Sequence, residues 1–113
     1  MSTKIEAMQG RIQRIKEDLL ELGEMRPGTL SKQYNVCGKK GCRCKDARNP
    51  QKHGPYYQLS FSHKGRSRTQ FVKKQALGEV RFQLKNYATF RKLTETWVAL
   101  SIELAAAKSK RGS

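Results

Sequence analysis

The sequence predicts an α+β fold in which an N-terminal amphipathic helix, a Cys/His turn, a β-hairpin and a long C-terminal helix follow one another. Three observations favour this order. Apolar residues recur at helical steps in both terminal segments, they alternate with polar residues in the middle, and all three cysteines lie between the first helix and the hairpin. The two helices are expected to lie antiparallel or to form a coiled coil.

The length and composition allow one small domain with a modest core. Hydrophobic residues make up 36% of the 113 residues, less than in most globular domains. Such a chain is expected to gain stability from a metal ion, from oligomerisation or from a bound partner. We divide it into a helix at 1–24, a basic module at 25–75, a second helix at 76–108 and a tail at 109–113.

The first helix is predicted by a capping box and a regular apolar seam. Thr3 and Glu6 have the Ser/Thr-x-x-Glu spacing that caps a first turn. The seam repeats at steps of three and four through Ile5, Met8, Ile12, Ile15, Leu19 and Leu22. Gly23 and Pro27 are expected to stop the helix. A coiled coil and an amphipathic helix packed on its own domain explain this seam equally well.

The second helix is expected from about Gly78 to Ala107, and its apolar stripe is wide. One seam consists of Phe90, Leu93, Trp97, Leu100 and Leu104, and it is widened by Val80, Leu84, Tyr87, Val98 and Ile102. A stripe this wide can pack on the first helix and the sheet, or on a second subunit. The residues after Lys108 are predicted to be a frayed tail.

The middle of the chain predicts a hairpin over residues 56–72. The turn falls near Lys64-Gly65, where glycine supplies a positive φ. Core positions are expected for Tyr57, Leu59, Phe61 and Phe71, whereas Lys64, Arg66 and Arg68 are expected to face outward. Residues 30–36 favour a third short strand that leads into the first cysteine.

The cysteines and one histidine have the spacing Cys-x4-Cys-x-Cys-x8-His. These four residues are Cys37, Cys42, Cys44 and His53. Three thiolates and one imidazole are the ligands of a closed, structural zinc site, and the surrounding cationic side chains favour thiolates. Loops are expected on each side of His53, at Asn49-Pro50 and Gly54-Pro55. The alternative is three thiols without metal, with Cys37 packed as a small apolar residue.

The cysteine count and the N-terminus favour a reducing compartment, the cytoplasm. Three cysteines cannot all pair within one chain, and the N-terminus lacks the uninterrupted apolar run of a signal peptide. Metal ligation is therefore expected in place of disulfides. No apolar stretch approaches the length of a membrane span, so no membrane association is expected.

Positive charge is concentrated in the middle of the chain. The net charge is +15, and residues 26–75 carry thirteen basic side chains against one acidic residue, Asp46. Such a segment predicts a nucleic-acid partner, DNA or RNA. The expected phosphate contacts are Lys39, Lys40, Arg43, Lys45, Arg48, Lys52, Lys64, Arg66 and Arg68, and Tyr56 is expected to be free to stack on unpaired bases.

Four features resemble a family of short, uncharacterised bacterial proteins. They are a Pro-Gly-(Ser/Thr)-Leu motif at 27–30, a Cys-Gly-Lys-x-x-Cys-x-Cys core at 37–44, a His-Gly-Pro-Tyr motif at 53–56 and the helix after the hairpin. The resemblance covers about residues 26–100. It implies an association with mobile genetic elements and an accessory role, without assigning catalysis.

Catalytic interpretations fit the residues poorly. A metal-dependent nuclease needs clustered carboxylates, and the basic segment holds only Asp46. His63 and Arg66 are explained by the predicted turn, which they flank. His53 and His63 lie ten residues apart with a predicted strand between them, so we do not expect them to form a catalytic pair. We therefore expect no enzyme but a zinc-stabilised nucleic-acid-binding protein, homodimeric through its helical seams. The alternative is an adaptor whose helices dock on a recombinase, a transposase or another nucleic-acid enzyme.

Overall fold

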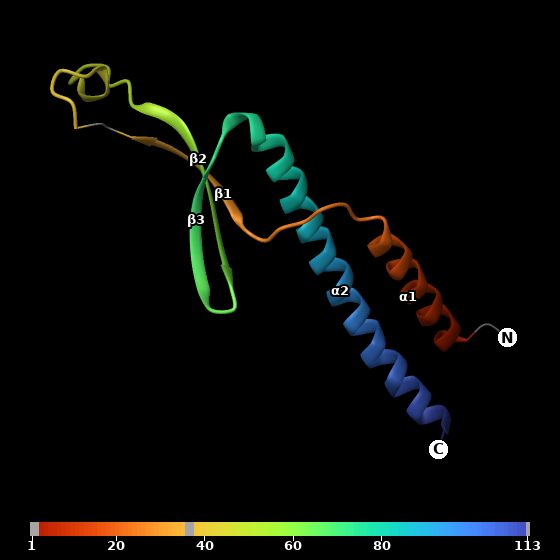
Figure 1. The fold of residues 1–113 in the computed structure, drawn as a ribbon. Coiled ribbons are helices and arrows are strands. Elements are labelled where there is room, and N and C mark those ends of the chain that lie inside the picture. The colour runs from red at the N-terminus through yellow and green to blue at the C-terminus, as the bar shows by residue number, and fades with distance from the viewer. Residues whose placement is uncertain (1–2, 36–37, 113) are drawn as a thin grey trace. The chain divides into compact units, whose positions relative to one another are not determined.

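A computed structural model describes residues 3–35 and 38–112 of the protein. The elements are α1 (Lys4–Leu20), β1 (Thr29–Asn35), η1 (Arg43–Lys45), β2 (His53–His63), β3 (Arg66–Val72), η2 (Lys74–Ala76) and α2 (Leu77–Gly112) (Figure 1). This order confirms the α+β class and the third strand. The chain forms two compact units: Met1–Arg26 with Lys85–Ser113, and Pro27–Leu84. Among the described helices, none is long and apolar enough to cross a membrane.

In the first unit, α1 packs antiparallel on the C-terminal half of α2 (Figure 1). The Oγ1 atom of Thr3 accepts a hydrogen bond from the backbone N–H of Glu6 at 3.1 Å, which confirms the predicted cap. The core of this unit consists of Met8, Ile12, Ile15 and Leu100, flanked by Leu19, Leu93, Trp97, Leu104 and Ala107. The two predicted seams therefore meet within one chain.

The ends of both helices differ from the prediction. The first helix ends at Leu20, with Glu21 as its C-cap, before the expected stop at Gly23. The second helix continues to Gly112, so the prediction of a frayed tail after Lys108 was wrong. The reason lies in the sequence, because three alanines at 105–107 and the lysines after them are strong helix formers with no breaker before Gly112.

In the second unit, three antiparallel strands have the order β1-β2-β3, and the first turns of α2 pack on one face. Leu59 is fully buried in the centre of this face. Its neighbours in the core are Val72, Leu77 and Val80, with Leu30, Tyr57, Phe61, Ala76 and Leu84 at the edge. The core positions predicted for Tyr57, Leu59 and Phe61 are thus confirmed.

The turn of the hairpin decides which side chains share this core face. Lys64 and Gly65 both have positive φ, 52° and 78°, so the turn has two residues and pairs His63 with Arg66. Directly opposite residues of antiparallel strands lie on the same face. Arg68 is opposite Phe61 and therefore lies on the core face at its far end, and the prediction that Arg66 and Arg68 face away from the apolar residues was wrong.

Phe71 is the other correction that the register requires. It lies opposite Gln58, on the face that α2 does not cover, and 72% of its surface is exposed. Its predicted place in the core is taken by Val72, which pairs with Tyr57 and is buried. Alternation along the strand cannot place both of these adjacent side chains in the core.

Candidate functional site

Three of the four predicted metal ligands lie together at the ends of β1 and β2. The ligand atoms of Cys42, Cys44 and His53 are all within 4.8 Å of one another. The Sγ atom of Cys42 is 3.2 Å from Nε2 of His53. Cys44 is only 1% exposed, whereas Cys42 and His53 are half-buried. The fourth predicted ligand, Cys37, lies outside the described residues.

Backbone hydrogen bonds form the turn that carries the two cysteines. The N–H of Lys45 donates to the carbonyl of Cys42 at 3.0 Å, within the short helix η1. The N–H of Gln51 donates to the carbonyl of Arg43 at 2.9 Å and closes the loop after η1. Gly41, directly before the first of these cysteines, has a φ of +79°, which glycine adopts without strain.

The histidine is held by the sheet and not by a loop. His53 begins β2 opposite Asn35 of β1, so the prediction of a loop at Gly54-Pro55 was wrong. Gly54 has a φ of +127°, and a Cβ atom there would lie 2.8 Å from the carbonyl oxygen of Gln33. The absence of a side chain at this position therefore lets β1 and β2 approach closely beside the histidine.

The donor atoms fit a metal ion in both distance and chemistry. Tetrahedral ligands at metal–sulfur and metal–nitrogen distances of about 2.3 and 2.0 Å lie roughly 3.5–3.8 Å from one another. The Sγ atom of Cys42 and Nε2 of His53 are 3.2 Å apart, and all three described ligand atoms lie within 4.8 Å of one another, which is close to these separations. Thiolate and imidazole donors are soft or intermediate ligands, which suit zinc and related transition metals and not magnesium or calcium. The group can therefore hold a metal ion.

The predicted nucleic-acid contacts are all exposed, and they form two clusters. The turn cluster consists of Lys39, Lys40, Arg43, Lys45, Arg48 and Lys52, and the tip cluster consists of Lys64, Arg66 and Arg68. The turn cluster lies around the cysteines before β2, and the tip cluster follows the end of β2 (Figure 1). A strand of 11 residues separates them, which corresponds to roughly 35 Å.

The tip cluster surrounds a shallow hollow of about 470 Å³. Its lining is formed by Phe61, His63, Lys64, Arg66 and Arg68. Because the register places Phe61 opposite Arg68 and His63 opposite Arg66, cations and two flat rings share one side of the hairpin. This combination offers ionic contacts and an apolar floor to a ligand that carries both phosphates and rings.

Positive charge in the second unit is not neutralised by neighbouring acids. Among the described residues of 27–84, no ion pair joins a basic side chain to an acidic one. Asp46 is used by the turn itself, because its Oδ1 atom accepts the backbone N–H of Arg48 at 3.0 Å. The basic side chains therefore repel one another, and a bound polyanion would reduce this repulsion.

Lys32 of β1 lies beside aromatic side chains that favour its charged form. Its ammonium group lies 5.7 Å from the ring centre of Tyr34. A hydrogen bond with Tyr34 raises the pKa of Lys32 above its ordinary value, and the charge interactions with Tyr34 and Tyr57 act in the same direction. Desolvation of Lys32 and then the charge of Arg81 oppose this shift of the pKa.

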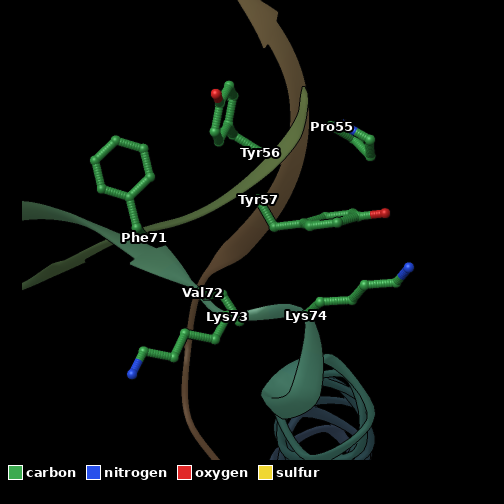
Figure 2. A pocket seen from close by; sticks show the side chains of 7 residues that line it. All are labelled: Pro55, Tyr56, Tyr57, Phe71, Val72, Lys73 and Lys74. Carbon is green, nitrogen blue, oxygen red and sulfur yellow. The ribbon is translucent and has the colours of Figure 1, made fainter. Parts of the chain in front are cut away.

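A hollow that the sequence analysis missed lies where β2 begins and β3 ends, and side chains from both faces of the sheet line it. Pro55, Tyr56, Tyr57, Phe71, Val72, Lys73 and Lys74 line a hollow of about 360 Å³ (Figure 2). Tyr56 was predicted as an exposed aromatic residue and is 41% exposed. The exposure of Phe71 and the place of Lys73 and Lys74 beside it in the lining were not predicted. The signal was present in the sequence, because a two-residue turn at Lys64-Gly65 puts Phe71 and Tyr56 on the same face.

Comparison with known proteins identifies a family without assigning an activity. The model of a family described as "Domain of unknown function (DUF6788)" matches residues 5–81, from α1 to the first turns of α2. Neither the curated proteins nor the solved structures contain a match to the chain. The matched region includes the Cys/His turn, all three strands and well over half of the 113 residues. The chain therefore belongs to the DUF6788 family.

Proposed function

We propose that this protein binds nucleic acid through its second unit, residues 27–84, which we call the sheet unit. We also propose that a structural zinc ion holds its Cys/His turn. The protein would act in the cytoplasm as an accessory factor of a mobile genetic element. The observation that carries the binding function is the uncompensated charge of residues 27–84. The unit carries thirteen basic and two acidic residues, a net charge of +11, and both clusters defined above are exposed. The accessory role is supported by the sequence resemblance alone.

The proposed zinc ion would be held by Cys42, Cys44 and His53, with Cys37 as the fourth ligand. Zinc with four protein ligands has no open position for substrate or water, and it supplies folding energy by cross-linking its ligands. Here it would tie the turn that carries six basic side chains to the first residue of β2. The turn cluster would then have a fixed orientation relative to the strands.

Salt titration tests the binding function. Fluorescence anisotropy with labelled DNA and RNA should give an affinity that falls linearly on a double-logarithmic plot, with a slope of about −0.9 per phosphate contact for duplexes and about −0.7 for single strands. The double variant Arg66→Ala/Arg68→Ala should reduce the magnitude of that slope by about 1.4–1.8, because two contacts are lost.

The matched control is Arg91→Ala/Lys92→Ala, which removes the same charge from α2 in the other unit. Arg91 is held near Glu95 at 3.8 Å, and we expect the slope to stay close to that of the unaltered protein. Equal effects of the two double variants would mean that net charge, and not the tip cluster, determines binding. Absence of binding, or binding that is independent of salt, would refute the function.

The second candidate function is an adaptor for a nucleic-acid enzyme, and one observation favours it. Val98 and Ile102, one turn apart on α2, are 58% and 66% exposed although both are apolar. A protein partner could cover this face. Mass determination by size-exclusion chromatography with light scattering discriminates between the candidates. A stable homodimer favours the binding function proposed first, whereas a monomer with this face exposed favours the adaptor.

A further inference from the structure

The uncovered face of the sheet is polar except for two neighbouring aromatic rings. Tyr56 of β2 and Phe71 of β3 are 41% and 72% exposed, and Figure 2 shows both rings on one side of the strands. The side chains that share this face are Thr29, Ser31, Gln33, Gln58, Ser60, Ser62, Ser67 and Thr69. Two exposed rings side by side on a polar face form a small apolar patch, and such patches are typical of binding sites.

The spacing of the two rings favours unpaired bases as the ligand. Phe71 is directly opposite Gln58, and Tyr56 is two residues before Gln58, so the two aromatic residues form a diagonal pair. Diagonal neighbours in a sheet are about 7–8 Å apart, whereas successive bases of a duplex strand rise by about 3.4 Å. Each ring can therefore stack on a separate base that is splayed out, which a single strand permits and a duplex does not.

Two lysines lie at the edge of the hollow that the rings line. Lys73 and Lys74 directly follow β3, line the same hollow as Tyr56 and Phe71, and are exposed. Their ammonium groups extend from the edge of the hollow in different directions (Figure 2). Aromatic faces for the bases with adjacent cations for the phosphates are the two components of a single-strand-binding surface.

We propose that this face binds single-stranded nucleic acid, with Tyr56 and Phe71 stacking on two bases and Lys73 and Lys74 binding the phosphates. The proposal rests on the nucleic-acid binding proposed above, and it adds the class of ligand and the surface that selects it. The tip and turn clusters bind phosphates of any strand, whereas this face requires an unpaired base.

The test compares three labelled probes of about 12 nucleotides at one salt concentration: a single strand, its duplex, and an abasic strand with the same number of phosphates. The unaltered protein should prefer the single strand. Phe71→Ala should weaken single-strand binding by about 5- to 150-fold and leave abasic and duplex binding unchanged. Phe71→Leu should weaken it similarly, because leucine is apolar without a ring, whereas Tyr56→Phe should retain it.

Phe82→Ala is the matched control, because Phe82 is 55% exposed on α2 and lies outside this face. It should leave all three affinities unchanged, and thermal melting should show that Phe71→Ala folds like the unaltered protein. Equal, salt-dependent binding of all three probes, or unchanged binding by Phe71→Ala, would overturn this proposal and leave nucleic-acid binding intact. If none of the probes binds at low salt, both proposals fail.

Discussion

At the scale of single residues, the proposed metal centre is expected to depend most on Cys44. It is the most buried of the three described ligands, and its sulfur lies where water has little access. A thiolate in such a place needs a cation, because burying an uncompensated charge is costly. A metal ion bound by Cys42, Cys44 and His53 would supply that charge next to the sulfur.

Cys44→Ser should abolish stoichiometric metal binding. A serine hydroxyl is a poor zinc ligand at neutral pH, and even the loss of a residue that only supports a ligand lowers metal affinity about 10- to 100-fold. The loss should therefore exceed about 100-fold in a chelator competition, with the metal content measured by mass spectrometry. Asn49→Ala changes an exposed residue of the same loop and should keep the metal. A metal content unaffected by Cys44→Ser would remove this centre from the proposal.

The raised pKa of Lys32 predicts a defined pH dependence. The shift is upward from 10.5, so the charged form is favoured in the folded state. Its contribution to stability is fully present below pH 10.5 and is lost as the pH rises through the higher, folded-state pKa. Tyr34→Phe removes the hydroxyl that forms the hydrogen bond and should return the pKa toward its ordinary value. Titration of the Lys32 side-chain carbon by NMR measures this, and an unchanged curve would contradict the assigned cause.

At the scale of elements, the contact between α1 and α2 is a seam of apolar side chains. Leu100 is 3% exposed and joins the cluster of Met8, Ile12 and Ile15. The other α2 residues of this seam, Leu93, Trp97 and Leu104, are half-buried. The Nζ atom of Lys16 on α1 lies 5.4 Å from the ring centre of Trp97. The stability of the first unit therefore arises from few buried groups.

Leu100→Ala should lower the free energy of unfolding by about 2–4 kcal/mol, because it leaves a cavity in a small core. The control is Ile102→Ala two positions along the same helix, where the side chain is 66% exposed, with an expected change below about 0.5 kcal/mol. Urea denaturation followed by circular dichroism gives both values. Similar costs for the two variants would show that Ile102 is covered in solution, for example by a second subunit.

The elements also show which parts of the fold can be predicted from the sequence. The repeated 3-4 step of Ile5 to Ile15 and the alternation of Tyr57 to Phe61 are local patterns, and both predictions were right about burial. Phe71 was misplaced because the face of a side chain on β3 depends on the number of residues in the turn, which alternation within one strand does not define. A loop was predicted at Gly54-Pro55, directly after His53, because this is a typical turn sequence, although β1 pairs with this segment.

The candidate site divides in the same way. Cys42, Cys44 and His53 were predicted from ligand type and spacing, and the structure brings them together. The basic side chains were correctly expected to be exposed, since so many like charges cannot be buried. Their separation into two clusters was not predictable from composition, because it depends on the length of β2.

At the scale of the whole molecule, charge and architecture divide the chain in the same place. The first unit, Met1–Arg26 with Lys85–Ser113, is the helical unit, and its eleven basic and seven acidic residues give a net charge of +4. The sheet unit has a net charge of +11. All described ligands of the metal centre belong to the sheet unit. The chain's single tryptophan, Trp97, belongs to the helical unit.

Removing the metal should therefore affect one unit more than the other. With a chelator, we expect faster amide hydrogen exchange in β1 and the first residues of β2, because a ligand bound only to the folded state stabilises it. The fluorescence emission of Trp97 should stay unchanged, since its neighbours are residues of α1 and α2. A parallel shift of the Trp97 emission would mean that the two units unfold as one.

The two-residue turn at Lys64-Gly65 also restricts how the length of this protein can vary in evolution. Lengthening both strands of the hairpin by equal numbers of residues leaves every pair opposite its partner, because the turn still defines the register. An insertion of one residue directly before Arg66 would exchange Val72 for Phe71 in the core and move Arg66 and Arg68 to the other face. Members of the DUF6788 family are therefore expected to change the lengths of β2 and β3 together, by equal numbers of residues, or to carry a bulge that restores the alternation.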